Sequence, residues 1–188
     1  MKNIDQKTLW QGRFIKTILI SYKDHNGVVR EWEAVGRLNE DGVVVIIPVT
    51  DNTELILIRQ FRPALNSYVI ELPAGLVDPG EDFISAAKRE LLEETGYSSD
   101  NMALLTEGVI STGINAEKWK IVVAQNVVRA TEEAIRMCPP DENENIEVIK
   151  MPAAGIYETL QEYSRSGDDV DLRIFGLWEL AKRTLNLL

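Results

Sequence analysis

Short runs rich in β-branched and aromatic residues recur along most of the chain, and turn-forming residues separate them. Such runs predict β-strands. Residues 10–22 form the first run, an Asn-Gly pair follows within residues 23–27, and residues 28–35 resume the pattern. This arrangement predicts an opening hairpin within a small N-terminal antiparallel β-sheet. Further strands are predicted over residues 43–49, 55–60, 68–72, 104–110, 118–127 and 146–151.

Helical patterns begin after a loop at residues 73–80, which holds two prolines and two glycines. Residues 82–95 are good helix formers, and Gly96 stands where a C′ glycine would end the helix. Two more helices are predicted over residues 153–164 and 169–187. Because strands and helices are mixed without regular βαβ units, the pattern predicts an α+β fold, built as an α/β/α sandwich over a mixed β-sheet.

The chain has 188 residues, with 20 basic and 30 acidic side chains and a formal charge of −10. This length suits one domain with a small appendage, and we expect an N-terminal sheet region at residues 1–38 and the main domain at residues 39–188. We expect no nucleic-acid partner, because such proteins need a basic surface. A phosphate substrate would need bound cations to help recruit it.

Cysteine content and hydropathy suggest where the protein acts. Cys138 is the only cysteine, so no intrachain disulfide can form, which fits a reducing compartment. Residues 1–10 hold no apolar segment of the kind found in a signal peptide. The longest strongly apolar run, residues 43–47, is too short to span a bilayer. We therefore expect a soluble, cytoplasmic protein without a membrane partner.

Three carboxylates crowd onto one face of the helix predicted at residues 82–95. Glu90, Glu93 and Glu94 stand at positions i, i+3 and i+4. Like charges at this spacing repel, so either solvent or a bound cation must offset the cost. A solvated helix face is the simpler interpretation of any acidic cluster. Hard divalent cations such as Mg²⁺, however, prefer all-oxygen ligands of this kind, and Arg89 is placed to orient one carboxylate.

The cluster belongs to a longer pattern that resembles the Nudix box, G-x5-E-x7-R-E-U-x-E-E-x-G-U, in which U is a bulky aliphatic residue. The matching residues are Gly75, Glu81, Arg89, Glu90, Leu91, Glu93, Glu94 and Gly96. Only the last position differs, where the chain has Tyr97. The resemblance implies the Nudix α/β/α sandwich and hydrolysis of a nucleoside diphosphate linked to a further moiety, with Mg²⁺, or Mn²⁺ as the alternative cofactor.

The resemblance extends over residues 10–165 and is greatest to the ADP-ribose and ADP-sugar pyrophosphatases. The segments 59–63 (RQFRP) and 71–75 (ELPAG) are arranged as in that branch. It implies that the Ala74 carbonyl, Glu90 and Glu94 bind metal, with Glu93 contributing in some members.

A late acidic segment, residues 141–148, is similar to the loop that supplies the general base in this branch. Two registers are open, and they make either Glu144 or Glu142 the base. Without the resemblance, the segment would be interpreted as a solvated turn after two prolines.

Residues 30–37 resemble the segment that holds adenine in the ADP-sugar enzymes. The resemblance implies that Trp32 stacks on the base with Phe14 on its opposite face, that Glu33 accepts a hydrogen bond from the base, and that Arg37 and Arg62 meet phosphate or base. Without it, the two aromatic residues would be assigned to a strand core.

In this branch two subunits exchange their N-terminal sheets, so the resemblance implies a homodimer. One departure concerns the substrate, because Thr112 stands where ADP-ribose enzymes have a proline. Hydrolysis of another nucleoside diphosphate sugar such as GDP-mannose therefore stays open. Another Nudix activity, on a nucleoside triphosphate or a dinucleotide, is a separate alternative. A regulator that binds nucleotide sugars without hydrolysing them is the alternative from another class, although such regulators usually have a degraded box.

Overall fold

The structure is a computed structural model that describes residues 1–38, 41–139 and 145–185. An eight-stranded mixed sheet forms its centre, in the order β13-β6-β5-β4-β10-β9, with β12 beside β5 and β7 beside β4. Its strands are β4 (Val43–Val49), β5 (Glu54–Arg62), β6 (Ser67–Glu71), β7 (Ala74–Leu76), β9 (Asn101–Val109), β10 (Lys118–Gln125), β12 (Ile146–Pro152) and β13 (Asp169–Val170). β4 runs parallel to β10 and β13 runs parallel to β6, whereas the other neighbours are antiparallel.

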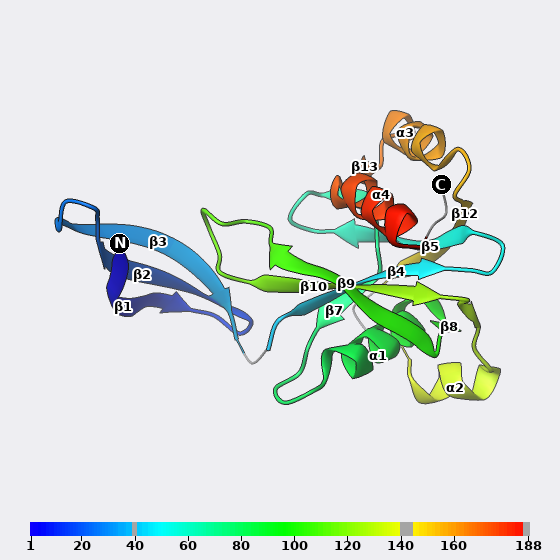
Figure 1. Ribbon diagram of the computed structural model, residues 1–188, viewed down its shortest axis with the longest axis horizontal. Coiled ribbons are helices and arrows are strands. Elements are labelled where there is room, and N and C mark those ends of the chain that lie inside the picture. Colours follow the sequence, from blue (N-terminus) through cyan, green and yellow to red (C-terminus); the bar gives the residue numbers. More distant parts are fainter. Residues whose placement is uncertain (39–40, 140–144, 186–188) are drawn as a thin grey trace.

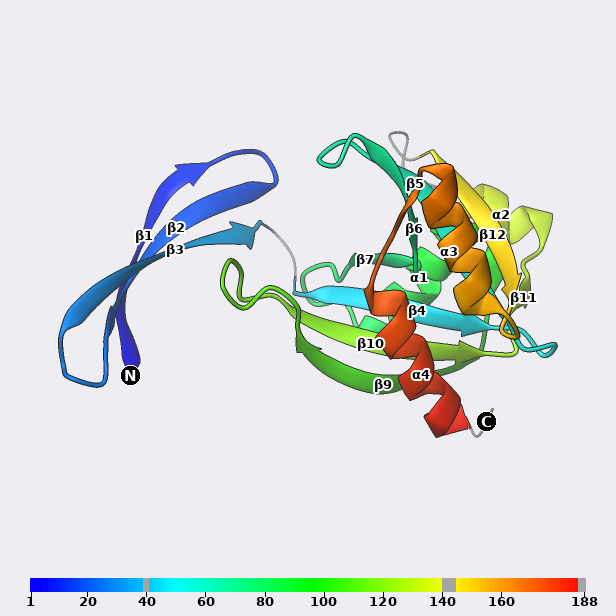
Figure 2. The same cartoon turned by 90° about the horizontal axis from the view of Figure 1, so that it is seen from above.

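Helices cover both faces of this sheet (Figures 1 and 2). They are α1 (Phe83–Thr95), α2 (Glu132–Met137), α3 (Ile156–Ser166) and α4 (Arg173–Leu185). Alternate residues of β4 face two separate cores: Val45 packs in a core with α3 and α4, and Val44 packs in a core with α1. All seven residues of β4 are buried, as expected of a strand covered on both sides. The α+β sandwich predicted from the sequence is confirmed.

β4 and β5 separate after the turn that joins them. Within the described residues their pairing is limited to Val49 and Leu55 beside that turn. At its other end β4 instead pairs with β7, and the Ile46 amide donates to the Pro73 carbonyl at 2.8 Å. This divergence leaves a gap between the start of β4 and the end of β5, and the cavity described below occupies it.

The first three strands form a sheet of their own, which lies to one side of the body (Figures 1 and 2). These strands are β1 (Lys2–Gln11), β2 (Ile15–Lys23) and β3 (Val29–Arg37). The single strand predicted over residues 10–22 is wrong, because the chain turns at Gly12 and β1 precedes the turn. Every residue of β1 is exposed, and its apolar residues do not alternate regularly with polar ones, so the strand lacks the pattern by which a strand is recognised.

Two other elements differ from the prediction. α2 was not predicted, and its N-terminus is capped by Thr131, whose hydroxyl accepts from the Ala134 amide at 3.2 Å. α4 begins at Arg173 rather than at residue 169, because Asp169 and Val170 pair with β6 as strand β13. No helix in the described ranges is long and apolar enough to cross a membrane.

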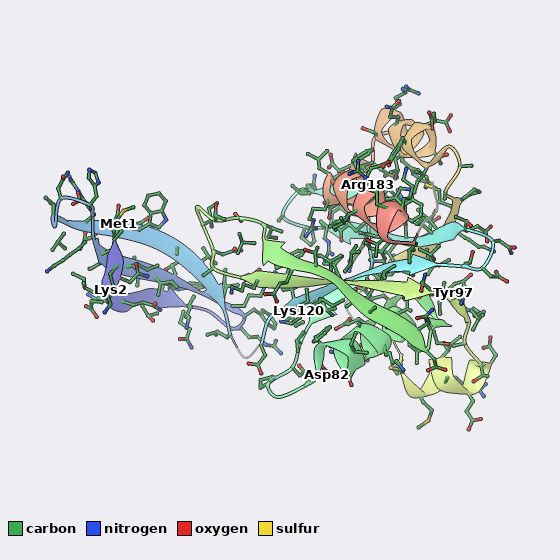
Figure 3. The ribbon with its side chains drawn as sticks, viewed as in Figure 1. Met1, Lys2, Asp82, Tyr97, Lys120 and Arg183 are labelled. Carbon is green, nitrogen blue, oxygen red and sulfur yellow. The ribbon has the colours of Figure 1, made fainter. Side chains whose placement is uncertain are left out.

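The acidic helix α1 has well-defined ends. The Asp82 carboxylate caps its first turn by accepting from the Ile84 and Ser85 amides at 3.1 and 3.2 Å, and Figure 3 labels Asp82 at this end of the helix. Gly96 ends the helix in the left-handed region at φ 68°, as the sequence predicted. Ala86, Ala87 and Leu91 bury the helix against the sheet. The glutamates therefore project from a helix fixed at both ends.

Candidate active site

A cavity of about 570 Å³ lies where β4 and β5 diverge. Its walls come from the 74–78 segment, the acidic side of α1, the first residues of β4 and β10, and the start of α4. Charged residues dominate the lining, and its basic members are Arg37, Arg62, Arg89 and Arg173. Cations and carboxylates thus meet in one concave space, as expected of a site for a phosphate ester and a metal ion.

Glu90 lies against the backbone of Gly75. A Cβ atom added to Gly75 would stand 1.9 Å from the Glu90 Cδ and 2.0 Å from its Oε1. No side chain fits between the two residues, so the glycine is required for close approach rather than for an unusual φ angle. The carboxylate is thereby held beside the Ala74–Gly75 backbone, the place where the sequence predicts a metal ligand.

Arg89 organises the acidic face of α1. Its guanidinium donates to both oxygens of Glu81 at 3.2 and 3.0 Å, to Glu90 at 2.7 Å, to Glu93 at 3.1 Å and to the Leu76 carbonyl at 3.0 Å. These hydrogen bonds match the five N–H donors of an arginine. The sequence predicted contact with one carboxylate, whereas the structure shows three. The guanidinium supplies the positive charge that the crowded glutamates require.

The same network changes proton affinities. The hydrogen bonds from Arg89 hold the pKa of the Glu81 carboxyl below its usual value of 4.5, against the opposing effect of partial burial. The hydrogen bond to Glu81 in turn raises the pKa of Arg89 above its ordinary value. Both shifts keep this pair ionised at neutral pH.

Glu94 connects α1 to the loop opposite. It is 6% exposed, and its Oε2 accepts from the Ala74 amide at 2.9 Å. The three α1 glutamates and the backbone of Ala74 thus lie in one region and offer the hard oxygen donors that Mg²⁺ prefers. Among the described residues, no group of three or more His, Cys, Asp or Glu side chains is arranged to hold a metal ion. The carboxylates instead accept hydrogen bonds from Arg89 and from the Ala74 amide.

Arg62 and Glu71 form a second charged pair at the rim of the cavity. The Arg62 Nε lies 3.0 and 3.1 Å from the two Glu71 oxygens, and its Nη2 also donates to Glu71. Glu71 itself is 9% exposed, so the pair is partly shielded from water. The pairing holds the planar guanidinium at the edge of the cavity, where it can meet an anionic substrate.

Comparison with known proteins agrees with this geometry. The family described as NUDIX domain matches residues 40–166. The chain belongs to the Nudix family. It is 30% identical over 164 residues to the ADP-ribose pyrophosphatase of Saccharomyces cerevisiae, covering 82% of this chain and 71% of that protein. It is also 30% identical over 159 residues to the ADP compounds hydrolase NudE of Escherichia coli, covering 85% and 81%.

A solved structure of an ADP compounds hydrolase matches nearly all of this chain. The TM-score is 0.78 at 26% identity, and the match covers 98% of this chain and 94% of the other. The comparison therefore includes the N-terminal sheet as well as the Nudix domain. The protein is a Nudix hydrolase, and members of this family generally need divalent metal ions.

Cys138 lies beside α1, a contact that the sequence did not reveal. Its thiol donates to the Glu93 Oε1 at 3.3 Å. Burial, followed by the hydrogen bond to Glu93, raises the pKa of the Cys138 thiol to about 11. The thiol therefore stays protonated at neutral pH. The two residues are 45 positions apart and share no local pattern, so nothing in the sequence indicated the contact.

The residues predicted to hold the base are spread over the N-terminal sheet. Trp32 is 50% exposed, and its indole N–H donates to the Gly113 carbonyl at 3.0 Å. Trp32 pairs with Ile20, whereas Phe14 lies six residues before Ile20, which corresponds to about 20 Å along a strand. Glu33 follows Trp32 in the strand, so its side chain leaves the opposite face. Within one chain, these three side chains do not converge.

Arg37 connects the N-terminal sheet to the cavity. It ends β3, lines the cavity and donates from Nε to the Glu117 Oε1 at 3.0 Å. Beside it, the Val35 amide donates to the Ile114 carbonyl at 2.7 Å. The loop between β9 and β10 therefore fixes the end of β3 against the body, an arrangement visible in Figure 2.

The remaining site residues are the two predicted general bases and three cavity residues that the sequence did not predict. Glu142 and Glu144, the two candidates for the general base, lie outside the described residues. Sequence reasoning missed Trp119, Asp171 and Arg173, which line the cavity from β10 and from the start of α4. The sequence predicts only a helix over residues 169–187, and a helical pattern gives no reason to expect an arginine facing a site.

Proposed function

We propose that this Nudix hydrolase uses Mg²⁺ to cleave the diphosphate bond of ADP-ribose or a related ADP-sugar. The products would be AMP and a sugar phosphate. The observation that carries the proposal is the Glu90 carboxylate held between Gly75 and Arg89 in a cavity lined by arginines. The names of the two relatives, an ADP-ribose pyrophosphatase and an ADP compounds hydrolase, support this substrate class.

The donor set fits Mg²⁺, since it consists of carboxylates and one backbone carbonyl on rigid elements. We propose that Glu90, Glu94 and the Ala74 carbonyl would hold the ion, with Glu93 contributing. Bound there, Mg²⁺ would neutralise the diphosphate and lower the pKa of a bound water. Manganese, which accepts similar oxygen ligands, is the alternative.

The protein's own groups would position and activate the reactants. Arg62 would contribute positive charge to the binding of the diphosphate at the rim of the cavity, and Arg89 would keep the carboxylates in their orientation. The water oxygen would form a bond to one phosphorus while the bridging P–O bond breaks, and the water proton would pass to a general base. Glu144 or Glu142 stays the predicted base, and both are outside the described residues.

The N-terminal sheet supports a further part of the proposal, a homodimer. Its exposed apolar side chains include Ile4, Leu9, Trp10, Phe14 and Trp32. A sheet with no core of its own would normally be covered. We propose that two chains pair through these sheets, which would let Trp32 of one chain and Phe14 of the other face the same adenine. Light scattering after size-exclusion chromatography tests this, and a monomer at micromolar concentration would reject it.

One substrate panel tests the activity. The protein is incubated with Mg²⁺ and with ADP-ribose, ADP-glucose, GDP-mannose, NADH or a nucleoside triphosphate, and released phosphomonoester is measured with a phosphatase. We expect the highest kcat/KM for ADP-ribose or ADP-glucose. A preference for GDP-mannose or a triphosphate would reject the ADP-sugar assignment. Turnover of no substrate in Mg²⁺ or Mn²⁺, together with tight binding of ADP-ribose, would instead indicate a regulator that only binds.

A further inference from the structure

Arg173 lines the cavity from the helical layer opposite to α1. It is the first residue of α4, which packs on the sheet face that carries Val45, whereas α1 packs on the face that carries Val44. Glu90 and Arg173 nevertheless line the same cavity. The two sides of the cavity thus belong to different layers of the sandwich.

Arg173 is held in one orientation by two neighbours. Its Nε donates to the Asp171 carboxylate at 2.8 and 2.7 Å, and its Nη2 pairs with the same carboxylate. Its Cζ lies 4.2 Å from the centre of the Trp119 ring, so the guanidinium stacks on the indole. Such contacts fix a long side chain before a ligand arrives, which lowers the entropic cost of binding.

One nitrogen of this fixed guanidinium has no acceptor. Arg173 Nη1 is buried and has no hydrogen-bond partner among the described residues. A buried donor left unpaired on a charged group is costly, so its persistence calls for a ligand. Because Nε and Nη2 are committed to Asp171, Nη1 is the nitrogen of Arg173 whose hydrogen-bonding capacity is unused.

A chain of hydrogen bonds and one cation–π contact links Arg173 to the N-terminal sheet. The Glu117 carboxylate accepts from the Trp119 indole at 3.3 Å and from the Arg37 Nε at 3.0 Å. The Trp119 ring in turn makes the cation–π contact with Arg173. Arg173 and Trp119 also border an apolar groove of about 280 Å³ on the outer side. Together they form a wall of the cavity that the predicted catalytic residues do not use.

We propose that Arg173 is a specificity-determining residue that donates from Nη1 to the moiety attached to the nucleoside diphosphate. This inference rests on the proposed function and adds the residue that distinguishes a terminal sugar from a bare phosphate. The pairing with Asp171 supports a neutral, hydroxyl-bearing ligand, because the carboxylate offsets the charge of the guanidinium. A sugar hydroxyl both donates and accepts, so it complements this pair.

Binding of two non-hydrolysable analogues tests the proposal. Isothermal titration calorimetry of the full chain in Mg²⁺ compares α,β-methylene ADP-ribose, which carries the sugar, with α,β-methylene ADP, which lacks it. For Arg173→Gln we expect the Kd of the first analogue to rise about tenfold and that of the second to change less than twofold. The matched control is Arg183→Gln, which removes the same charge from an exposed position of α4, labelled in Figure 3. It should change neither Kd.

A second variant covers the case in which Arg173→Gln does not fold. Arg173→Lys keeps a cation beside Asp171 but has no second nitrogen to present, so we expect the same selective loss. Equal weakening of both analogues would assign Arg173 to the diphosphate and overturn the proposal, as would no change in either. If the wild-type protein bound neither analogue, the proposed function itself would fail, and this inference would fall with it.

Discussion

The carboxylate of Glu90 touches the Cα of Gly75 so closely that the hydrogen atom of glycine is the largest group the space accepts. This contact joins the acidic helix to the loop that precedes it. It also explains in physical terms why the motif begins with a glycine 15 residues before the glutamate.

Gly75→Ala should therefore disable the enzyme. The added methyl group would stand 1.9 Å from the Glu90 Cδ and displace the carboxylate from the cavity wall. We expect kcat to fall about a hundredfold, with a loss of about 1–3 kcal/mol in the free energy of unfolding. The control is Gly176→Ala, where an added Cβ meets nothing within 4 Å. Steady-state kinetics and denaturant melts compare the two variants, and wild-type turnover in Gly75→Ala would contradict the contact.

Glu94→Gln tests the predicted metal ligand. The amide keeps the size of the side chain and can still accept from the Ala74 amide, but it loses the charge that attracts a cation. We expect kcat to fall about a thousandfold at saturating Mg²⁺ while the thermal midpoint changes little. Glu158→Gln, at an exposed position of α3, is the matched control. Equal activities of the two variants would remove Glu94 from the metal site.

The Glu81–Arg89 pair predicts a pH-dependent contribution to stability. Because the pKa of Glu81 lies below its usual 4.5 in the folded protein, the unfolded state binds a proton more readily. The contribution is therefore complete above pH 4.5 and is lost as the pH falls through the folded-state pKa. Thermal melts of wild type and Glu81→Gln from pH 7 to about 3 should show a difference that shrinks with acidity. A constant difference would mean that the pair does not act through charge.

Trp32 is predicted to stack on the base. Trp32→Ala should raise KM for ADP-ribose about tenfold with a smaller loss of kcat, the pattern of lost uniform binding. Trp32→Phe keeps an aromatic face but loses the indole N–H that donates to Gly113. If stacking matters, Phe should retain most of the affinity. If Phe and Ala raise KM equally, the hydrogen bond to the β9–β10 loop is the important contact and stacking is rejected.

The regular parts of this protein were predictable because their patterns are local. The ends of α1 follow from Gly96 and from the helix formers before it, and the core strand β4 follows from its continuous apolar run. β1 was missed because its exposed side chains carry no face pattern. The motif also identified Arg89 as an orienting group, although its contacts with three carboxylates depend on the path of the 76–81 segment.

Contacts between distant parts of the chain could not be predicted in the same way. Cys138 meets Glu93 across 45 positions, and Arg173 reaches the cavity from a helix whose pattern indicates packing on the body. Both depend on how the layers stack, a property that one-dimensional periodicity does not contain. The roles assigned to Phe14, Trp32 and Glu33 stay predictions, since they require a second chain.

The buried strand β4 lies between the two helical layers, and residues from both layers line the cavity. Residues facing α1 support the acidic helix, and their neighbours one position along support α4. Substitutions in the core beside α4 thus leave unchanged the residues that pack against α1 and its glutamates. Descendants of one ancestral enzyme could acquire new leaving groups by altering a single layer, while the bond that they break stays the same.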